Sequence, residues 1–354
     1  MFEGTFEDHL RSGKDGSLTQ ADGRRYRGSW RDDKPHGQGE EITATRTSYK
    51  GQYEHGCWHG KGREVTVLGD EYNGEWEKGL RHGSGDYFAD GLHYVGEWVK
   101  GKRHGRGRCT FRNGDVYDGE FEGDVMHGEG FMLLSSGSRY EGEWHKGVMH
   151  GRGTMLFPNG DEYTGEWRSG KREGKGAYAS RVSGSVYEGE FAKGRRHGRG
   201  RQQSVAPAPS AHQTRGAMPF RVVRGECYDG EWRGGRRSGA GEVTLGGRVV
   251  YAGAFVNDLR DGHGEATFRS GARYVGLWRE GRMHGEGVLT TAGGGARERR
   301  VVRGVWELGQ CVRVMGEGEG AGAGAGAAPG AGSGGGATME HFERGRERVL
   351  LHSG

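Results

Sequence analysis

The sequence predicts an all-β fold, an elongated single-layer twisted antiparallel meander of about 12 to 13 β-hairpin repeats. Glycine supplies 76 of the 354 residues and apolar residues only 32%, so the chain lacks the side chains for one large globular core. The nine Trp, 14 Tyr and 12 Phe recur at regular positions, which indicates packing rather than disorder. The stretch YVGEWVKGKRHGRG, beginning at Tyr94, also returns as YEGEWHKGVMHGRG at Tyr140.

Each repeat opens with an aromatic residue, followed by glycine after two positions and by a second aromatic residue after four. Tyr94, Gly96 and Trp98 show this pattern. A period of two places all three on one face of an extended strand. Because Gly96 has no Cβ, the flanking rings can fold over the backbone and stack on the rings of neighbouring repeats. The opening aromatic residues follow one another after 22 to 24 residues, apart from one gap of 41: Phe2, Tyr26, Tyr49, Tyr72, Tyr94, Tyr117, Tyr140, Tyr163, Tyr187, Tyr228, Tyr251 and Tyr274.

The motif HGxG follows this first strand, as at His104 to Gly107, and we expect it to form the turn into a second strand. Alternating apolar residues such as Cys109 and Phe111 come next and predict the second strand. That strand ends in a dipeptide such as Asn113-Gly114 or Asp90-Gly91, which supplies the positive φ of tight hairpin turns. Since a lone hairpin is marginally stable in water, the repeats must pair edge to edge in one sheet.

Composition divides the chain into five segments. Residues 1-200 hold about nine repeats, and residues 225-315 continue the ribbon with three repeats and a degenerate one. Residues 201-224 contain three prolines and predict a loop, either a tolerated surface insertion or a hinge or partner-binding loop. Residues 316-337 predict a flexible Gly/Ala-rich linker. Residues 338-354 are a C-terminal tail, either a broken half repeat or a short basic helix at a partner.

The charge balance and the cysteines argue against several classes of protein. The 52 Lys and Arg exceed the 48 Asp and Glu by only four, which is too balanced for a protein whose main partner is nucleic acid. The four cysteines lie far apart without a CxxC pair and predict neither a zinc site nor a disulfide framework. The sequence has no apolar segment typical of a signal peptide or a membrane span. We therefore expect a reducing, intracellular setting.

The YVGEWVKGKRHGRG pattern, with its period near 23 residues and its NG or DG turns, resembles the MORN repeat (membrane occupation and recognition nexus) from Phe2 to about Gly309. The resemblance implies a curved ribbon of β-hairpins without catalytic residues of its own. Proteins similar to this one, built of repeats alone, act as cytoskeletal, ciliary or cell-cortex scaffolds, and some form elongated dimers. Others are linked to membranes through phospholipid binding.

From this resemblance we expect a non-enzymatic protein-protein interaction scaffold of a cytoskeletal, ciliary or flagellar, or membrane-cortical structure. The alternative is a membrane adaptor that binds phosphoinositides or other anionic phospholipids. We expect cytoskeletal or ciliary protein partners, no nucleic acid, no cofactor, and a homodimer through the unpaired strands of the terminal repeats. The expected location is cytoplasmic, at the cytoskeleton or a cilium, or peripheral on the inner face of a membrane.

Neither the histidines nor the glutamates predict a metal or catalytic site. One His in each repeat, such as His104, recurs about every 10 Å along a ribbon, whereas zinc needs three or four converging ligands. The Glu of each GEW or GEF sequence, such as Glu97, is expected to lie on a solvated face and to pair with nearby Lys and Arg.

Two sets of residues remain as candidate interaction sites. Tyr and Trp rings can form a groove for an extended or helical partner segment, the alternative being that the rings only bury each other. Basic residues beside each HG turn can line a rim that holds anionic headgroups, the alternative being solubility alone. The candidate partner groove consists of Tyr94, Trp98, Tyr140, Trp144, Tyr163 and Trp167. The candidate anionic-lipid rim consists of Lys102, Arg103, Arg106, Lys171, Arg172, Arg195, Arg196 and Arg199.

Overall fold

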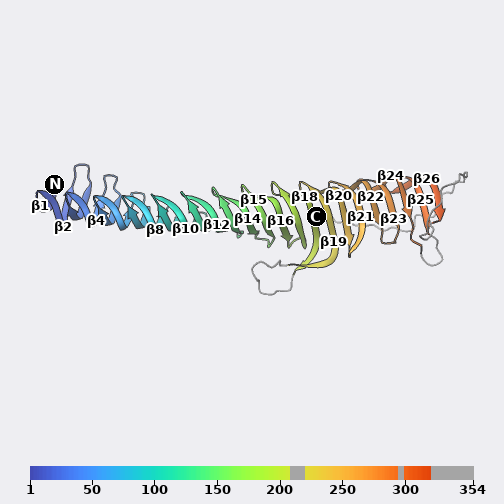
Figure 1. The fold of residues 1–354 in the computed structure, drawn as a ribbon, viewed down its shortest axis with the longest axis horizontal. Helices are drawn as coiled ribbons and strands as arrows, with labels where there is room; N and C mark the ends of the chain where they lie inside the picture. Colours follow the sequence, from blue (N-terminus) through green and yellow to red (C-terminus); the bar gives the residue numbers. More distant parts are fainter. Residues whose placement is uncertain (208–219, 294–298, 320–354) are drawn as a thin grey trace.

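The computed structural model describes residues 1–207, 220–293 and 299–319, and in these residues all regular structure is β. Its 26 strands form one antiparallel sheet, in which each strand pairs with the strands that precede and follow it in the sequence. The sheet is a long open ribbon with β1 at one end and β26 at the other (Figure 1). The predicted all-β antiparallel meander is confirmed.

Each hairpin of the ribbon is an odd-numbered strand followed by an even-numbered one. The odd strands carry the aromatic-x-Gly-x-aromatic pattern, and most even strands carry HGxG or a variant of it. The strands are β1 (Phe2–Glu7), β2 (Leu10–Thr19), β3 (Arg25–Arg31), β4 (Lys34–Ile42), β5 (Ser48–Glu54), β6 (Cys57–Val65), β7 (Glu71–Glu77), β8 (Leu80–Ala89), β9 (Leu92–Val99), β10 (Lys102–Thr110), β11 (Val116–Glu122), β12 (Val125–Leu133), β13 (Arg139–His145), β14 (Val148–Leu156), β15 (Glu162–Arg168), β16 (Lys171–Ser180), β17 (Ser185–Ala192), β18 (Arg195–Pro207), β19 (Phe220–Arg233), β20 (Arg236–Leu245), β21 (Arg248–Val256), β22 (Leu259–Thr267), β23 (Arg273–Arg279), β24 (Arg282–Thr290), β25 (Arg300–Glu307) and β26 (Gln310–Glu319).

The turn inside a hairpin lies before the HGxG motif and not within it, as the pair β9 and β10 shows. Lys100 and Gly101 connect the two strands with φ of 51° and 82°, the left-handed pair of a two-residue hairpin turn. Gly101 N also donates a hydrogen bond of 2.8 Å to Arg81 O in the preceding repeat. The tight turns from β3–β4 to β25–β26 are each tied to the repeat before them by a backbone hydrogen bond of this kind.

The prediction that HGxG forms the turn was wrong, because the motif is a bulge inside β10. His104 pairs with Glu97 and Gly107 pairs with Gly96, so two residues of β10 between them have no counterpart on β9. Gly105, one of these two, has a φ of 56°. A left-handed glycine within a paired strand accommodates extra residues without reversing the chain.

The NG and DG dipeptides lie in the turns between hairpins, as predicted. Asp90 and Gly91 form a two-residue turn with φ of 43° and 78°. The Asn113-Gly114 turn is one residue longer, and it is closed by hydrogen bonds from Phe111 N to Asp115 O (2.8 Å) and from Gly114 N to Phe111 O (2.9 Å). In that turn only the glycine has positive φ, at 86°.

The core of the ribbon is a ladder of aromatic rings on one face of the sheet. Tyr94 and Trp98 are 0% and 3% exposed, and their rings meet edge to face with centroids 5.3 Å apart. Tyr94 also meets Phe121 of the next repeat edge to face at 5.2 Å. The same two contacts recur along the sheet, so each repeat shares its core with its neighbour.

A pair of glycines lies beneath each tyrosine. Gly96 and Gly107 face each other across β9 and β10, and a Cβ added at Gly107 would lie 2.4 Å from Tyr94 Cε2. The ring lies flat over this pair, and Tyr94 Oη donates a hydrogen bond to Glu97 O at 2.9 Å. Glycine therefore makes room for the ring, as expected, and the last glycine of HGxG contributes as much as the glycine between the aromatic residues.

The loop predicted for residues 201-224 was too long. The pairing of β18 with β19 runs from Gly198 and Trp232 to Pro207 and Phe220, so both ends of the predicted loop are strand. This pairing joins the two predicted ribbon segments into one sheet. Only residues 208–219 of the loop lie outside the described part of the structure. Likewise β26 continues to Glu319, into the predicted linker, whereas residues 320–337 and the tail lie outside the described residues.

Candidate functional site

The two faces of the sheet present different side chains. The ring face carries the aromatic ladder, including Tyr94 and Trp98, and the opposite face carries alternate residues such as Val95 and Glu97. Any partner of the described ribbon must use one of these faces, an edge of turns, or an end strand.

The six aromatic residues of the candidate partner groove do not form an exposed groove. All six are buried, with exposures between 0% and 7%, because they pack against each other and against neighbouring repeats. The Trp144 and Trp167 indoles also donate hydrogen bonds inside the ladder, to Gly130 O (3.2 Å) and Gly153 O (3.1 Å). The alternative, in which the rings bury each other, therefore describes Tyr94, Trp98, Tyr140, Trp144, Tyr163 and Trp167.

A second layer of side chains covers the ring ladder. It comes from the residue that precedes the His of each HGxG motif, and we call this residue the lid position. Arg103 occupies it in β10, with its guanidinium 5.7 Å from the Tyr94 ring centroid and 5.3 Å from that of Phe121. Along the ribbon the lid residues are Arg11, Pro35, Trp58, Arg81, Arg103, Met126, Met149, Arg172, Arg196, Arg237, Arg260 and Met283.

Several lid arginines clamp one repeat to the next. Arg103 donates hydrogen bonds from its backbone N (3.0 Å) and Nε (3.3 Å) to Asp124 Oδ1 and from Nη2 to Asp124 O (3.0 Å). Arg11 makes the same three contacts with Asp33. Sequence analysis missed this role, although an Asp 21 or 22 residues after a lid arginine was a signal that could have revealed it.

The eight residues of the candidate lipid rim do not form one rim. Arg103, Arg172 and Arg196 are half-buried lid residues that lie over the rings. Adjacent residues of a strand point to opposite faces, so a basic dipeptide such as Lys102-Arg103 is divided between the faces. The rim residues that remain exposed are Lys102, Arg106, Lys171, Arg195 and Arg199.

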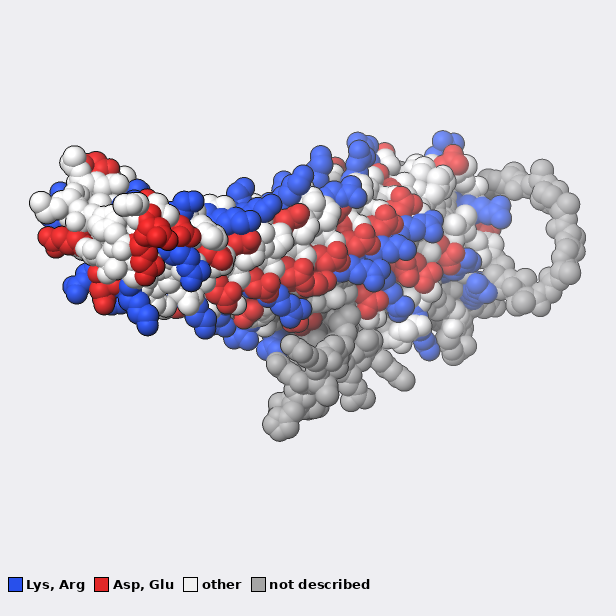
Figure 2. Space-filling view, turned by 60° about the vertical axis from the view of Figure 1, so that its left-hand side comes forward, with Lys and Arg blue, Asp and Glu red and all other residues white. Residues whose placement is uncertain are grey.

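The recurrent glutamate of the GEW sequence accepts a hydrogen bond from a backbone N–H group. The predicted role, pairing with Lys and Arg side chains, did not include this contact. Glu97 Oε1 accepts a hydrogen bond from Arg106 N at 3.0 Å, which is the backbone N–H between the two glycines of HGxG. Glu190 binds Arg199 N in the same way at 3.0 Å. Acidic and basic side chains are interleaved over the surface of the ribbon seen in Figure 2.

The repeat geometry agrees with the comparison with known families. The model of the MORN repeat matches residues 26–47, 72–93, 94–116, 117–139, 140–162, 163–181, 187–205, 228–245, 251–273 and 274–296. The chain belongs to the MORN-repeat family. MORN repeats are commonly modules for interaction with proteins or membranes.

Other comparisons add little to this assignment. No curated protein sequence matches the chain. A solved structure of streptogramin B lyase is 11% identical and covers 78% of this chain and 94% of its own, with a TM-score of 0.14, a similarity too weak to bear on the fold. Within residues 1–207, 220–293 and 299–319, no helix has the length and apolar character needed to cross a bilayer.

The hairpin of β5 and β6 lies outside the matched ranges and follows the same MORN geometry with local changes. In β5 and β6, Tyr49 and Tyr53 keep the edge-to-face contact at 5.3 Å. Trp58 at the lid position stacks flat on Tyr49, with centroids 4.3 Å apart and an interplanar angle of 4°. Its Nε1 donates a hydrogen bond of 2.9 Å to Glu41 Oε2.

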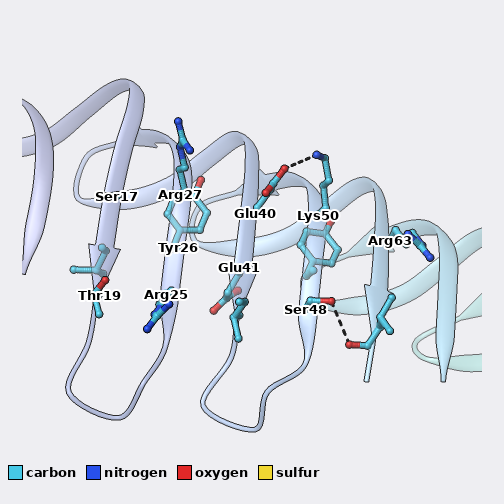
Figure 3. A pocket seen from close by; sticks show the side chains of 14 residues that line it. Ser17, Thr19, Arg25, Tyr26, Arg27, Glu40, Glu41, Ser48, Lys50 and Arg63 are labelled. Carbon is cyan, nitrogen blue, oxygen red and sulfur yellow. Dashed lines mark hydrogen bonds and ion pairs between the residues drawn. The ribbon is translucent and has the colours of Figure 1, made fainter. Parts of the chain in front are cut away.

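One open hollow of about 510 Å³ lies across β2 to β6, near the first MORN repeats (Figure 3). Two contacts join polar groups that line it. Glu40 and Lys50 form an ion pair, and Ser48 Oγ donates a hydrogen bond to Val65 O at 3.5 Å. The hollow therefore offers ion-paired and hydroxyl groups rather than an activated nucleophile.

The buried thiol and phenol groups of the ladder are held in their neutral forms. Burial raises the pKa of the Cys109 thiol and raises the pKa of Tyr163 to about 12. Both groups are therefore protonated at neutral pH. Among the described residues, no set of three His, Cys, Asp or Glu side chains is arranged to hold a metal ion.

Proposed function

We propose that this MORN-repeat chain is a non-enzymatic protein-protein interaction scaffold of a cytoskeletal, ciliary or flagellar, or membrane-cortical structure. The observation that carries the proposal is one continuous 26-stranded sheet in which the ring positions repeat while exposed positions such as those of Val95 and Asp118 differ between repeats. At about 4.8 Å per strand, such a sheet extends over roughly 120 Å. A surface of that length can hold several partners at fixed separations.

The roles of the recurrent titratable residues support a scaffold rather than an enzyme. Tyr94 and its counterparts build the ladder, and Glu97 and its counterparts bind backbone N–H groups. An enzyme built from these repeats would need such recurrent tyrosines and glutamates for catalysis, whereas here they have structural contacts.

Proximity labelling with the full chain fused to a biotin ligase tests the proposal, with the free ligase as control. We expect reproducible enrichment of cytoskeletal, ciliary or cortical proteins, and a tagged copy concentrated at one such structure in the cytoplasm. A diffuse tagged copy with no enrichment over the free ligase would contradict the scaffold function.

We also propose that two copies associate through their terminal repeats. β1 and β26 each pair with one other described strand, so each leaves a row of backbone N–H and C=O groups unpaired. Phe6 on β1 is 58% exposed and can add apolar contact to such a pairing. Light scattering over a range of concentrations should show a dimer. A strict monomer at the highest concentration would exclude this association.

The second candidate function is a membrane adaptor for phosphoinositides or other anionic phospholipids. It is favoured by the exposed basic residues Lys102, Arg106, Lys171, Arg195 and Arg199. A basic residue near an anionic surface contributes about 1 kcal/mol, so R195E/R199E should weaken vesicle binding by about 30-fold or more. Flotation with vesicles of phosphatidylserine and phosphatidylcholine measures this, and vesicles of phosphatidylcholine alone are the control. Equal flotation of wild type and variant would leave the scaffold as the better proposal.

A further inference from the structure

The lid residues of four successive repeats in the C-terminal half form a continuous basic row on the ring face. These are Arg172, Arg196, Arg237 and Arg260, and we call them the arginine row. Their guanidinium groups lie over aromatic rings, as Arg196 does at 4.3 Å from the Trp232 ring centroid and Arg260 at 4.7 Å from that of Tyr251.

The arginine row has fewer carboxylates than guanidinium groups. Arg237 pairs with Glu226 (3.3 Å) and Asp258 (3.5 Å). Within the described part of the chain, Arg172, Arg196 and Arg260 form no ion pair with a carboxylate. Arg172 and Arg196 instead donate hydrogen bonds to the backbone carbonyls of the next tight turn, at 2.7 and 3.0 Å.

Lid arginines nearer the N-terminus are each matched by an acidic residue. Arg11 pairs with Asp33 (3.0 Å), Arg81 with Glu64 (2.9 Å) and Arg103 with Asp124 (3.3 Å). The uncompensated charge is therefore a property of the C-terminal half of the ring face and not of the lid position in general.

Burial and neighbouring cations make this charge unfavourable in the free protein. Burial is the largest cause that lowers the pKa of Arg196 and of Arg260, and the adjacent Arg237 also acts to lower both. Asp258 acts in the opposite direction on Arg196, and Glu226 does so on Arg260, without outweighing burial. Half-buried cations that repel each other are stabilised by an anion placed against them. Binding of an anionic group against the arginine row is therefore expected to be favourable.

The spacing of the row selects the shape of an anionic partner. One repeat contains two strands, so neighbouring guanidinium groups lie about 9.6 Å apart along the ribbon. A polyproline II segment has three residues per turn and presents every third residue on one side, about 9.3 Å apart. An α-helix presents every seventh residue on the same side, about 10.5 Å apart. Over the three intervals between the four arginines, its side chains would fall out of register with the guanidinium groups by almost 3 Å. A β-strand presents them about 6.6 Å apart.

We propose that the arginine row binds an acidic peptide segment in the polyproline II conformation, with a carboxylate at every third residue, running across the strands on the ring face. This inference rests on the proposed scaffold function and gives the chemistry of one partner. The lid becomes apolar before Arg172, where Met149 and Met126 pack on the ladder. Apolar residues at the same spacing would extend the bound segment in that direction.

The test uses the full chain and a fluorescein-labelled (Glu-Pro-Pro)5 peptide, with binding followed by fluorescence anisotropy. We expect saturable binding that R196M/R260M weakens at least tenfold. Methionine occupies the lid at Met126, Met149 and Met283, so this variant should fold, as thermal unfolding can verify. R196K/R260K keeps the charge but loses the planar guanidinium that stacks on the rings, so it should bind the peptide more tightly than R196M/R260M does.

The matched control is R195M/R199M, which removes two arginines of β18 and so changes the net charge by the same amount as R196M/R260M. These two side chains are exposed rather than part of the lid, so the control should change peptide affinity less than twofold. Equal losses in the two double variants would show general electrostatic attraction and overturn the proposal.

Other probes separate the remaining outcomes. A peptide of the same composition with its five glutamates adjacent should bind at least tenfold more weakly, and equal binding would overturn the spacing argument. Tighter binding of a helical peptide with Glu at every seventh residue would overturn the polyproline II conformation. A further outcome is that the wild-type chain binds phosphatidylserine vesicles but not the peptide, and that R196M/R260M loses the vesicle binding. In that case the arginine row binds lipid and the proposal is wrong. Partners found by proximity labelling would still support the scaffold function if the peptide proposal failed, so the two proposals are tested separately.

Discussion

Glu97 and Arg106 are joined across a bulge, because Glu97 Oε1 accepts a hydrogen bond from Arg106 N at 3.0 Å. Gly105 lies directly beneath the carboxylate, and a Cβ added there would be 2.4 Å from Glu97 Oε2. The contact recurs between Glu143 and Arg152 N at 2.7 Å. The glutamate of GEW and the first glycine of HGxG therefore form one structural unit, although they lie on different strands.

Glu97→Ala should loosen this bulge without disrupting the ring ladder. A hydrogen bond to an exposed carboxylate contributes about 1 kcal/mol, so the Arg106 amide should exchange with solvent about fivefold faster. Hydrogen exchange measured by NMR reports this amide directly. The matched control is Glu97→Gln, because Gln52 makes the same contact with Lys61 N at 2.8 Å. Exchange in Glu97→Ala at the wild-type rate would show that the hydrogen bond does not hold the bulge.

Gly107→Ala should destabilise the ladder by overpacking. The new Cβ would lie 2.4 Å from Tyr94 Cε2, and the tyrosine is held by its hydrogen bond to Glu97 O. We expect a loss of about 1 to 3 kcal/mol, seen as a lower midpoint of thermal unfolding followed by tryptophan fluorescence. Gly316→Ala is the control, because a Cβ at Gly316 meets no atom within 4 Å. Equal midpoints for the two variants would contradict the packing role of Gly107.

The sequence alone predicts the hairpin and its core because both depend on strict periodicity. Tyr94, Gly96 and Trp98 alternate with period two, which fixes their common face, and Asp90-Gly91 fixes a turn by its backbone preferences. Both predictions are confirmed by the strands and φ values of the structure.

The position of the bulge could not be predicted, because a left-handed glycine suits a turn and a bulge equally well. Placing the turn at His104 to Gly107 instead of Lys100-Gly101 put adjacent residues on the wrong faces. Arg103 was therefore assigned to an exposed rim, whereas it covers the rings of the ladder. The prolines in residues 201-224 predicted a loop over the whole segment, although backbone pairing of β18 with β19 extends to Pro207 and Phe220.

Asp161 should make the stability of its turn depend on acid pH. It is 4% exposed and accepts hydrogen bonds from Tyr178 Oη (2.6 Å), Arg181 N (2.8 Å) and Asn159 Nδ2 (3.0 Å). Burial acts to raise the pKa of Asp161, but these hydrogen bonds outweigh it and hold the pKa below 3.8. Because the folded pKa lies below the unfolded value of about 3.9, the stabilisation is complete above that value and is lost as pH falls through the folded pKa.

Asp161→Asn should therefore be less stable than wild type at pH 7, by about 1 kcal/mol, and the difference should shrink as the pH falls below about 4. Thermal unfolding at a series of pH values measures this. Asp229→Asn changes an exposed aspartate and should shift the midpoint little at any pH. A difference between Asp161→Asn and wild type that is as large at pH 3 as at pH 7 would rule out this carboxylate as the cause.

The tyrosine ladder should resist alkaline titration until the ribbon itself unfolds. Burial raises the pKa of Tyr163 and of Tyr187 to about 12, from an ordinary value of 10.0. A folded pKa above the unfolded one means that the stabilisation is complete below about pH 10 and is lost as pH rises through about 12. In an alkaline titration, tyrosinate absorbance should therefore rise only near pH 12, together with loss of the strand signal in circular dichroism. Tyr163→Phe should remove one tyrosine from that late phase, together with the hydrogen bond from Tyr163 Oη to Glu166 O at 2.9 Å. If most of the tyrosines instead ionise near pH 10 with the circular dichroism unchanged, the rings are not buried in solution as the structure places them.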